Sequence, residues 1–443
     1  MPEARFNFPR GFLWGTASSA YQVEGGNTNN QWYLWEEEPG KIAEGGTCGL
    51  ACDWWNGRWR EDFDRAAEGK QNALRFSIEW SRIQPAPDRW DEHALDCYID
   101  MLRGLVQRGL FPLVTLHHFT DPIWVKEMGG WENDQVPELF AQYAEKVAIA
   151  IKSYVTTWTT INEPNVAAIL GYLTADFPPA VNDLSRTLNV MTNFARGHAL
   201  AYHKIKTVQP EGRVGVPHAY RGFSPHRSGS LLDRLAARLH HQTWNNFFPI
   251  MFRDGKVRLM GRSITVPEAK GTQDFLGLNY YTSDEVQFSL MAGRKGLFSR
   301  RTFPEGAALS PNEMIASVPG DFFKAMEWAL QFKVPVIVTE NGTEDEQDDF
   351  RREYLVQHIH QLWRAVNFNY PIKGYFYWSL VDNFEWEHGW TRRFGLWELE
   401  PKTQARKKRL SADLYSEICG ENALTSASVR KYAPQLFGKL FPG

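Results

Sequence analysis

Two glutamates, Glu163 and Glu340, end short β-rich runs in the motifs Thr-Ile-Asn-Glu-Pro and Val-Thr-Glu-Asn-Gly. Pro164 and Gly342 then interrupt any regular strand, so both carboxyl groups are expected at strand ends. Hydrolysis of a glycosidic bond needs two carboxyl groups, one that protonates the leaving oxygen and one that attacks or activates water. The position of both glutamates at strand ends is therefore consistent with glycoside hydrolysis.

Polar residues also stand at the ends of the other β-rich runs. Such residue types are not expected in a buried core, because an unpaired buried polar group is costly. The residues at these ends are Arg75 and Glu79, His117 and His118, Asn162, Asn279 and Tyr281, Asn341, and Trp378 and Asp382. Their recurrence predicts that one end of a set of parallel strands forms a polar site.

Eight β-rich runs alternate with helical stretches, which predicts repeated parallel βαβ units. The runs are Phe12–Gly15, Ala73–Ile78, Phe111–Leu116, Val155–Ile161, Val214–Pro217, Phe275–Tyr281, Val334–Val338 and Ile372–Trp378. Amphipathic segments between them include Pro137–Tyr154, Leu188–Val208 and Phe350–Val366. We predict an α/β fold with one (β/α)₈ TIM barrel over residues 1–443, whose site lies at the C-terminal ends of the strands.

A doubly wound sheet is the structural alternative, but no glycine-rich phosphate loop follows the first run. Three connections are longer than ordinary βα loops and are expected to form walls of the site. They are Glu24–Trp59, Leu170–Asp183 and Gln287–Glu313.

The charge and cysteine content of the chain disfavour several classes of partner and cofactor. The net charge of −3 on 443 residues favours neither nucleic acid nor an anionic membrane as partner. Two basic runs, Arg294–Arg301 and Arg406–Arg409, are interpreted as solvated surface. The four cysteines lack the spacing of a metal site, and no apolar leader or bilayer-spanning run is present. We therefore expect a cytoplasmic protein that needs neither a metal nor another cofactor.

The sequence resembles glycoside hydrolase family 1 nearly end to end, from Phe12-Leu-Trp-Gly-Thr-Ala to Arg393-Phe-Gly-Leu. Asn-Glu-Pro alone is shared by many barrel glycosidases. Its combination with Val338-Thr-Glu-Asn-Gly, Leu74-Arg-Phe-Ser-Ile-Glu-Trp-Ser-Arg-Ile and Tyr377-Trp-Ser-Leu-Val-Asp-Asn-Phe-Glu-Trp is specific.

The resemblance implies a retaining β-glucosidase in which Glu163 is the acid/base and Glu340 the nucleophile, with their carboxyl groups about 5 to 5.5 Å apart. Arg75, Asn279 and Tyr281 would support the nucleophile. The residues implied to contact the sugar are Gln22, His118, Asn162, Tyr281, Trp378, Glu385 and Trp386. The implied substrates are small β-glycosides such as cellobiose and aryl or alkyl β-glucosides, with β-fucosides and β-galactosides as further glycones and with possible transglycosylation.

Two alternatives remain open: a 6-phospho-β-glycosidase, which Glu385 disfavours because a carboxylate repels phosphate, and a non-catalytic sugar-binding barrel, which both glutamates disfavour. His117, Glu79, Arg82 and Asp382 are interpreted as structural, although Arg75 could instead pair with Glu79.

Two backbone features are also predicted. Neighbours in a regular strand point to opposite faces, so Asn162 and Glu163 can reach one sugar only from an irregular strand end. The family further implies a cis peptide between Trp378 and Ser379. Phe119, where the family commonly has Trp, and the stretch Trp397–Lys402 depart from the pattern.

Overall fold

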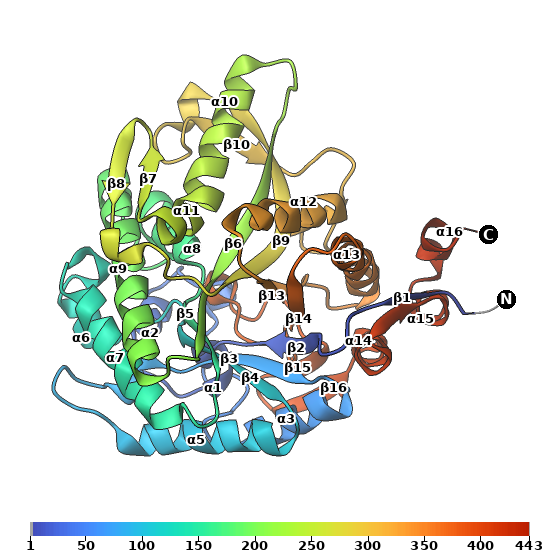
Figure 1. Ribbon diagram of the computed structural model, residues 1–443, viewed down its shortest axis with the longest axis horizontal. Coiled ribbons are helices and arrows are strands. Elements are labelled where there is room, and N and C mark those ends of the chain that lie inside the picture. Colours follow the sequence, from blue (N-terminus) through green and yellow to red (C-terminus); the bar gives the residue numbers. More distant parts are fainter. Residues whose placement is uncertain (1–2, 443) are drawn as a thin grey trace.

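The computed structural model describes residues 3–442, in which eight parallel strands close into a barrel (Figure 1). Each strand pairs with the next in the order given, and β9 also pairs with β6, which closes the ring. The strands, starting from β9, are β9 (Phe275–Phe288), β13 (Val336–Asn341), β14 (Ile372–Trp378), β2 (Leu13–Ala17), β3 (Ala73–Ser77), β4 (Phe111–His117), β5 (Thr157–Ile161) and β6 (Arg213–Pro225). The predicted (β/α)₈ barrel is confirmed, and the doubly wound alternative is wrong.

Helices surround the barrel because each buries one apolar stripe against the strands. The three predicted amphipathic segments are α7 (Val136–Ile151), α9 (Leu184–Val208) and α13 (Asp349–Asn367). The remaining α-helices are α1 (Ala20–Glu24), α2 (Gln31–Glu36), α3 (Trp59–Glu68), α4 (Trp80–Ile83), α5 (Glu92–Gln107), α6 (Ile123–Glu127), α8 (Pro164–Ala168), α10 (Leu231–His240), α11 (Phe247–Asp254), α12 (Pro319–Ala329), α14 (Leu410–Glu421), α15 (Ser426–Tyr432) and α16 (Phe437–Leu440).

Strands β6 and β9 continue beyond the barrel as a paired arm, where Pro225 lies opposite Val286. Strand β10 (Ser299–Thr302) pairs antiparallel with the end of β9 and widens this arm. Both strands extend beyond their predicted ends at Pro217 and Tyr281. Polar residues become frequent beyond those points because the arm is covered less completely than the barrel.

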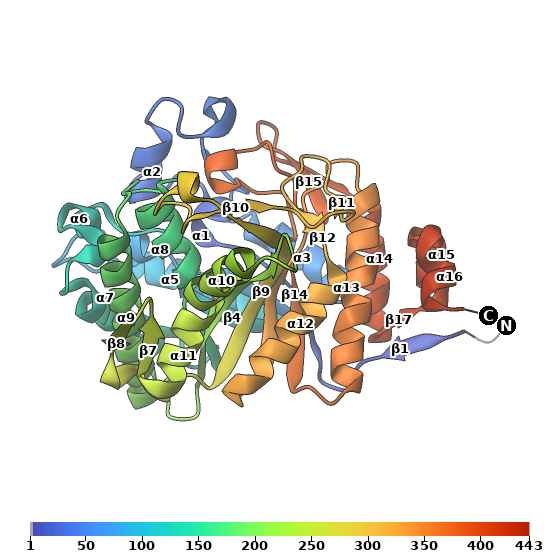
Figure 2. The same ribbon diagram turned by 90° about the horizontal axis from the view of Figure 1, so that it is seen from above.

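The first and last described segments of the chain lie side by side at one edge of the molecule (Figures 1 and 2). Strand β1 (Arg5–Asn7) pairs antiparallel with β17 (Ala423–Thr425), and Arg5 bonds the Glu421 carboxylate at 2.6 Å. The short remaining strands form local hairpins: β7 (Lys256–Leu259) with β8 (Arg262–Thr265), β11 (Ala308–Leu309) with β12 (Ala316–Ser317), and β15 (Trp397–Glu400) with β16 (Ala405–Lys408). Within residues 3–442, no helix combines the length and the apolar character that crossing a bilayer requires.

Candidate active site

The backbone places the two glutamates at the same end of the barrel. Glu340 lies in β13, one residue before the strand ends. Glu163 lies two residues beyond β5 and adopts a left-handed conformation, with φ 44° and ψ 57°, before Pro164 starts α8. The predicted irregular strand end is confirmed, and it turns the Glu163 side chain out of the alternation of β5.

Two strong donors hold the Glu340 carboxylate. Arg75 Nη1 lies 2.5 Å from one oxygen, and the Tyr281 hydroxyl donates to the other at 2.7 Å. The Arg75 side chain is fully buried and its second Nη donates to Asn162 Oδ1 at 2.6 Å. Arg75 therefore pairs with Glu340, and the alternative pairing with Glu79 is wrong.

The Glu163 carboxyl has a weaker set of donors. Asn279 Nδ2 donates to Glu163 Oε1 at 2.9 Å. Burial raises the pKa of Glu163 to about 8, and the negative charge of Glu340 adds to the increase, while Asn279 and Arg75 oppose it. A buried carboxyl group beside a second carboxylate holds its proton at neutral pH, which a general acid requires.

Both glutamates open into one cavity of about 210 Å³ at the C-terminal end of the barrel. Six further residues singled out from the sequence line the same cavity: His118, Asn279, Tyr281, Trp378, Glu385 and Trp386. Arg75, Gln22 and Asn162 are completely buried behind this lining.

The buried residues orient the side chains that line the cavity. Gln22 Nε2 lies 3.3 Å from Glu385 Oε2 and donates to the Phe384 carbonyl at 2.7 Å. Asn162 Nδ2 lies 3.0 Å from His118 Nε2. Burial, and next the Arg75 charge, lower the pKa of His118 well below its usual range, so the ring is neutral.

Glu385 has an environment that the sequence did not reveal. Burial raises its pKa to about 8, with Glu387 and Glu340 adding to the increase. A protonated Glu385 does not repel phosphate by charge, so Glu385 disfavours a 6-phosphoglycoside less than its residue type predicts. Among the lining residues the only Lys or Arg is Arg221, whose Nε and Nη2 each donate to an Asp284 carboxylate oxygen at 2.6 Å.

Several lining residues were missed from the sequence because they follow no strand-end pattern. They include Arg221, Trp244, Glu387 and His388. Glu387 alone had a signal, since it directly follows the motif that ends at Trp386 and lies two residues beyond Glu385. Burial raises the pKa of Glu387 to about 7.

The long loops contribute unequally to the walls. Leu170 and Phe177, from the second loop, line the cavity. Trp32, from the first loop, packs against Trp386 with ring centroids 4.7 Å apart. The expectation for Gln287–Glu313 is wrong, because its first part ends the arm, its β11 strand pairs with β12, and the cavity lining begins only beyond it, at Met314.

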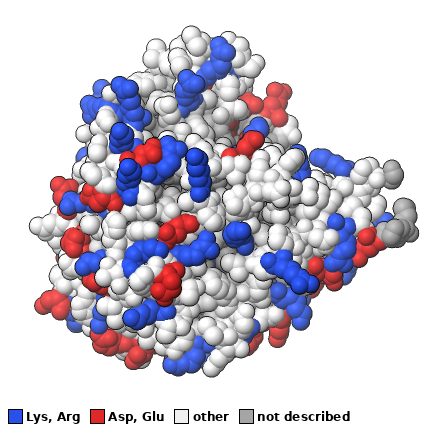
Figure 3. Space-filling view, in the orientation of Figure 1, with Lys and Arg blue, Asp and Glu red and all other residues white. Residues whose placement is uncertain are grey.

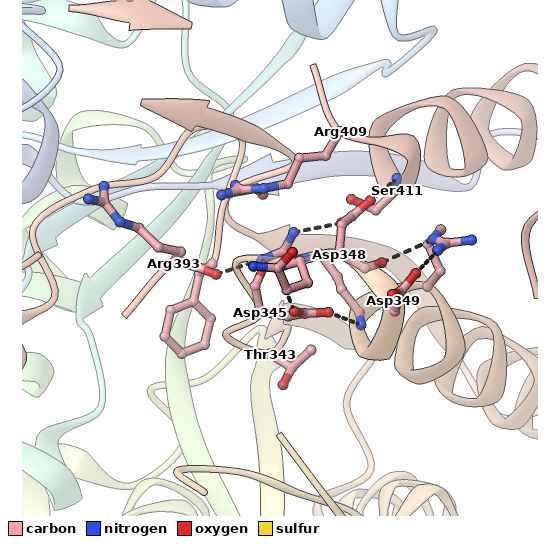
Figure 4. Close-up of polar contacts among 12 residues, drawn as sticks. Thr343, Asp345, Asp348, Asp349, Arg393, Arg409 and Ser411 are labelled. Carbon is pink, nitrogen blue, oxygen red and sulfur yellow. Dashed lines mark hydrogen bonds and ion pairs between the residues drawn. The ribbon is translucent and has the colours of Figure 1, made fainter. Parts of the chain in front are cut away.

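A polar network fixes the segment that follows Glu340 (Figure 4). The Asp345 N–H donates to the Arg393 carbonyl at 2.9 Å, and the Ser411 N–H donates to Asp348 at 2.7 Å. The fully buried Arg351 guanidinium bonds Asp348 at 2.6 Å. These contacts join the start of α13 to the loop that follows β13 and to α14, so they fix the segment that follows Glu340.

The residues interpreted as structural make buried contacts within the described chain. His117 Nε2 lies 2.9 Å from Asp121, and Arg82 pairs with Glu24 at 2.7 Å. Asp382 accepts two bonds from Arg409 at 2.8 and 2.9 Å, while Glu79 accepts from the Ser81 and Thr120 hydroxyls. The Trp378–Ser379 peptide is cis, as predicted. No group of His, Cys, Asp and Glu in residues 3–442 has the arrangement of a metal site.

Comparison with known proteins adds independent information. The family model for glycosyl hydrolase family 1 matches residues 4–424. The chain is 33% identical to β-glucosidase A of Thermotoga maritima, over 94% of this chain and 98% of that protein. A β-glycosidase structure from Pyrococcus horikoshii superposes with a TM-score of 0.89 at 31% identity, covering 97% of this chain and 98% of that one. The Thermotoga maritima β-glucosidase in complex with glucoimidazole gives 0.88 at 29% identity, with 95% and 100% covered.

Proposed function

The chain belongs to glycosyl hydrolase family 1, and from this we propose that it releases terminal β-D-glucosyl residues from small β-glucosides with retention of configuration. The observation that carries the proposal is the unequal environment of two buried carboxyl groups in one cavity. Glu340 has a guanidinium and a phenol as donors, whereas Glu163 has one amide. Cellobiose and aryl or alkyl β-glucosides are the proposed substrates, and β-galactosides and β-fucosides the further glycones.

In the first step Glu340 attacks the anomeric carbon while the bond to the leaving oxygen breaks. Glu163 gives its proton to that oxygen, and the product is a glycosyl ester of Glu340. The ester carries no charge, so one cause of the raised pKa of Glu163 disappears. Glu163 then takes a proton from water, the water oxygen attacks the anomeric carbon, and Glu340 is released.

The cavity walls can stabilise the sugar as its ring flattens. Trp378 provides an apolar platform, and His118 and Glu385 add polar atoms to the same cavity wall. Only contacts that strengthen in the transition state accelerate the reaction. Since the one lining guanidinium is occupied by Asp284, a 6-phosphate would find no free Lys or Arg there.

The four cysteines are free thiols, of which Cys48, Cys52 and Cys419 are buried. Unpaired thiols are typical of a reducing compartment, so we place the enzyme in the cytoplasm.

The test is initial-rate hydrolysis of nitrophenyl β-D-glucoside, galactoside, fucoside and 6-phosphoglucoside by the wild type and by Glu340→Ala. We expect turnover of the neutral sugars that the substitution abolishes. With azide, Glu340→Ala should yield the α-glycosyl azide and Glu163→Ala the β-glycosyl azide, because azide replaces the missing carboxylate from the face that it occupied. Turnover of the phosphorylated sugar alone would contradict the proposed substrate. A β-glycosyl azide from Glu340→Ala and an α-glycosyl azide from Glu163→Ala would contradict the roles proposed for the two glutamates.

A further inference from the structure

Exposed apolar side chains gather at one end of the arm. Of the thirteen large apolar side chains exposed in residues 3–442, six come from α10 and from the tip that joins β9 to β10, with exposures between 40% and 89%. They are Leu231, Leu232, Leu235, Leu290, Met291 and Phe298. Such clustering marks an interaction surface more often than solvated surface, where apolar residues are scattered.

Helix α10 and the tip are held against each other. The Phe288 N–H donates to Asp233 at 3.0 Å, and His240 bonds the Ser299 hydroxyl at 2.5 Å. Ala236 and Ala237 pack on Val286 of β9. This packing uses the inner face of α10, so its three leucines are left on the outer face.

Basic side chains surround the apolar ones. Five are exposed and make no ion pair in the described chain: Arg234, Arg238, Arg294, Lys295 and Arg300. The nearby carboxylates Asp233, Asp284 and Glu285 are already paired with Arg227, Arg221 and His226. Figure 3 shows mostly blue and white surface at the top of the molecule, where α10 lies. We call these eleven residues the α10 surface.

The second basic run of the sequence provides an internal comparison. Arg406 pairs with Asp62, Lys407 with Glu398, Lys408 with Asp413 and Arg409 with Asp382. Its charge is compensated by neighbouring carboxylates. The Arg294–Arg301 run also holds four basic residues, but of these only Arg301 has a carboxylate partner within residues 3–442, and the run lies beside apolar side chains.

We propose that the α10 surface docks on an anionic lipid surface. Leucine, methionine and phenylalanine side chains enter the boundary between headgroups and acyl chains, while Arg and Lys attract anionic headgroups. The net charge of −3 argued against such a partner, but that value averages over an uneven distribution. A second copy of the chain would have to offer a complementary acidic patch to balance the five bases.

Docking would bring the catalytic cavity close to the lipid. Tyr281 and Phe288 are both in β9, seven residues apart, which corresponds to about 23 Å of strand. The bound enzyme would thus hold its cavity within one strand length of the interface.

The experiment is co-sedimentation of the full chain with vesicles of phosphatidylcholine alone and of equimolar phosphatidylcholine and phosphatidylglycerol, at low and high salt. We expect binding to the anionic vesicles at low salt, weaker binding at high salt, and none to phosphatidylcholine. Leu290→Asp/Lys295→Glu should reduce partitioning at least about thirty-fold, because it removes an inserted side chain and reverses a charge. Its turnover of nitrophenyl glucoside should stay at the wild-type value.

The matched control is Leu410→Asp/Lys407→Glu, which makes the same changes at exposed positions beside the compensated run. It should sediment like the wild type. Absence of binding to anionic vesicles at low salt would overturn the proposal, as would equal losses in both double variants. A concentration-dependent dimer that only Leu290→Asp/Lys295→Glu disrupts, without vesicle binding, would assign the surface to a second copy and also overturn it.

Discussion

Replacing Arg75 with methionine should destabilise the fold as well as stop catalysis. The guanidinium is fully buried and bonds Glu340 at 2.5 Å, Asn162 at 2.6 Å and the Thr115 hydroxyl at 3.1 Å. Methionine has a similar length but no donors, so the Glu340 carboxylate keeps only the Tyr281 hydroxyl. Removing one partner of a buried ion pair costs about 3–5 kcal/mol.

The assay is urea unfolding followed by tryptophan fluorescence, combined with a double-mutant cycle. Glu340→Gln alone should cost less, about 1.5–3 kcal/mol, because Arg75 keeps its other acceptors. Arg75→Met/Glu340→Gln should be more stable than the sum of the single effects predicts, since neither charge is left alone. Lys146→Met is the control: its pair with Glu92 is also 2.5 Å long but exposed, and should contribute below about 1 kcal/mol. Additive effects, or a cost for Arg75→Met as small as that of the control, would refute the reasoning.

Three further outcomes are expected. The value of kcat/KM should fall above about pH 8 as Glu163 loses its proton, and Asn279→Ala should move this fall to higher pH because its amide lowers the Glu163 pKa; a fall at lower pH would contradict this. Burial lowers the pKa of His358 from 6.5 to about 3, so between these pH values the unfolded chain binds a proton on this ring that the folded chain does not, and the free energy of unfolding falls as the pH drops from 6.5 to 3. His358→Phe should make this fall shallower, and an unchanged slope in pH-dependent unfolding would contradict the prediction. Gly342→Ala should lower kcat and cost about 1–3 kcal/mol of stability, because the added Cβ would lie 2.1 Å from a β14 carbonyl, whereas Gly320→Ala meets open space and should leave activity unchanged.

The barrel could be predicted because its strands are buried on both faces and read as short apolar runs between amphipathic helices. The arm could not be predicted in the same way. Beyond Pro217 and Tyr281 the strands are partly uncovered, and their mixture of polar and apolar residues resembles the sequence of a loop. The α10 surface was equally hidden, since the sequence of α10 does not say which of its apolar residues face β9.

The residues of the site also divide into predictable and unpredictable ones. Residues at strand ends, such as Glu163, Arg75 and Glu340, were predictable because parallel strands bring their C-terminal ends together. Arg221 and Trp244 were not, because they belong to an arm and to a helix whose placement depends on tertiary packing. The state of Glu385 was also unpredictable, since its raised pKa arises mainly from burial and then from Glu387 and Glu340.

The assignment of roles to the two glutamates depends on their donors more than on their burial. Both side chains are buried at the end of parallel strands. Glu340 is bonded by a guanidinium and a phenol, donors that stabilise a carboxylate, whereas Glu163 is bonded by one neutral amide. In a cavity that disfavours two charges, the proton therefore resides on Glu163. When the proposed glycosyl ester neutralises Glu340, the same fixed geometry lets Glu163 release that proton and accept another from water, so the switch from acid to base needs no movement of the fold.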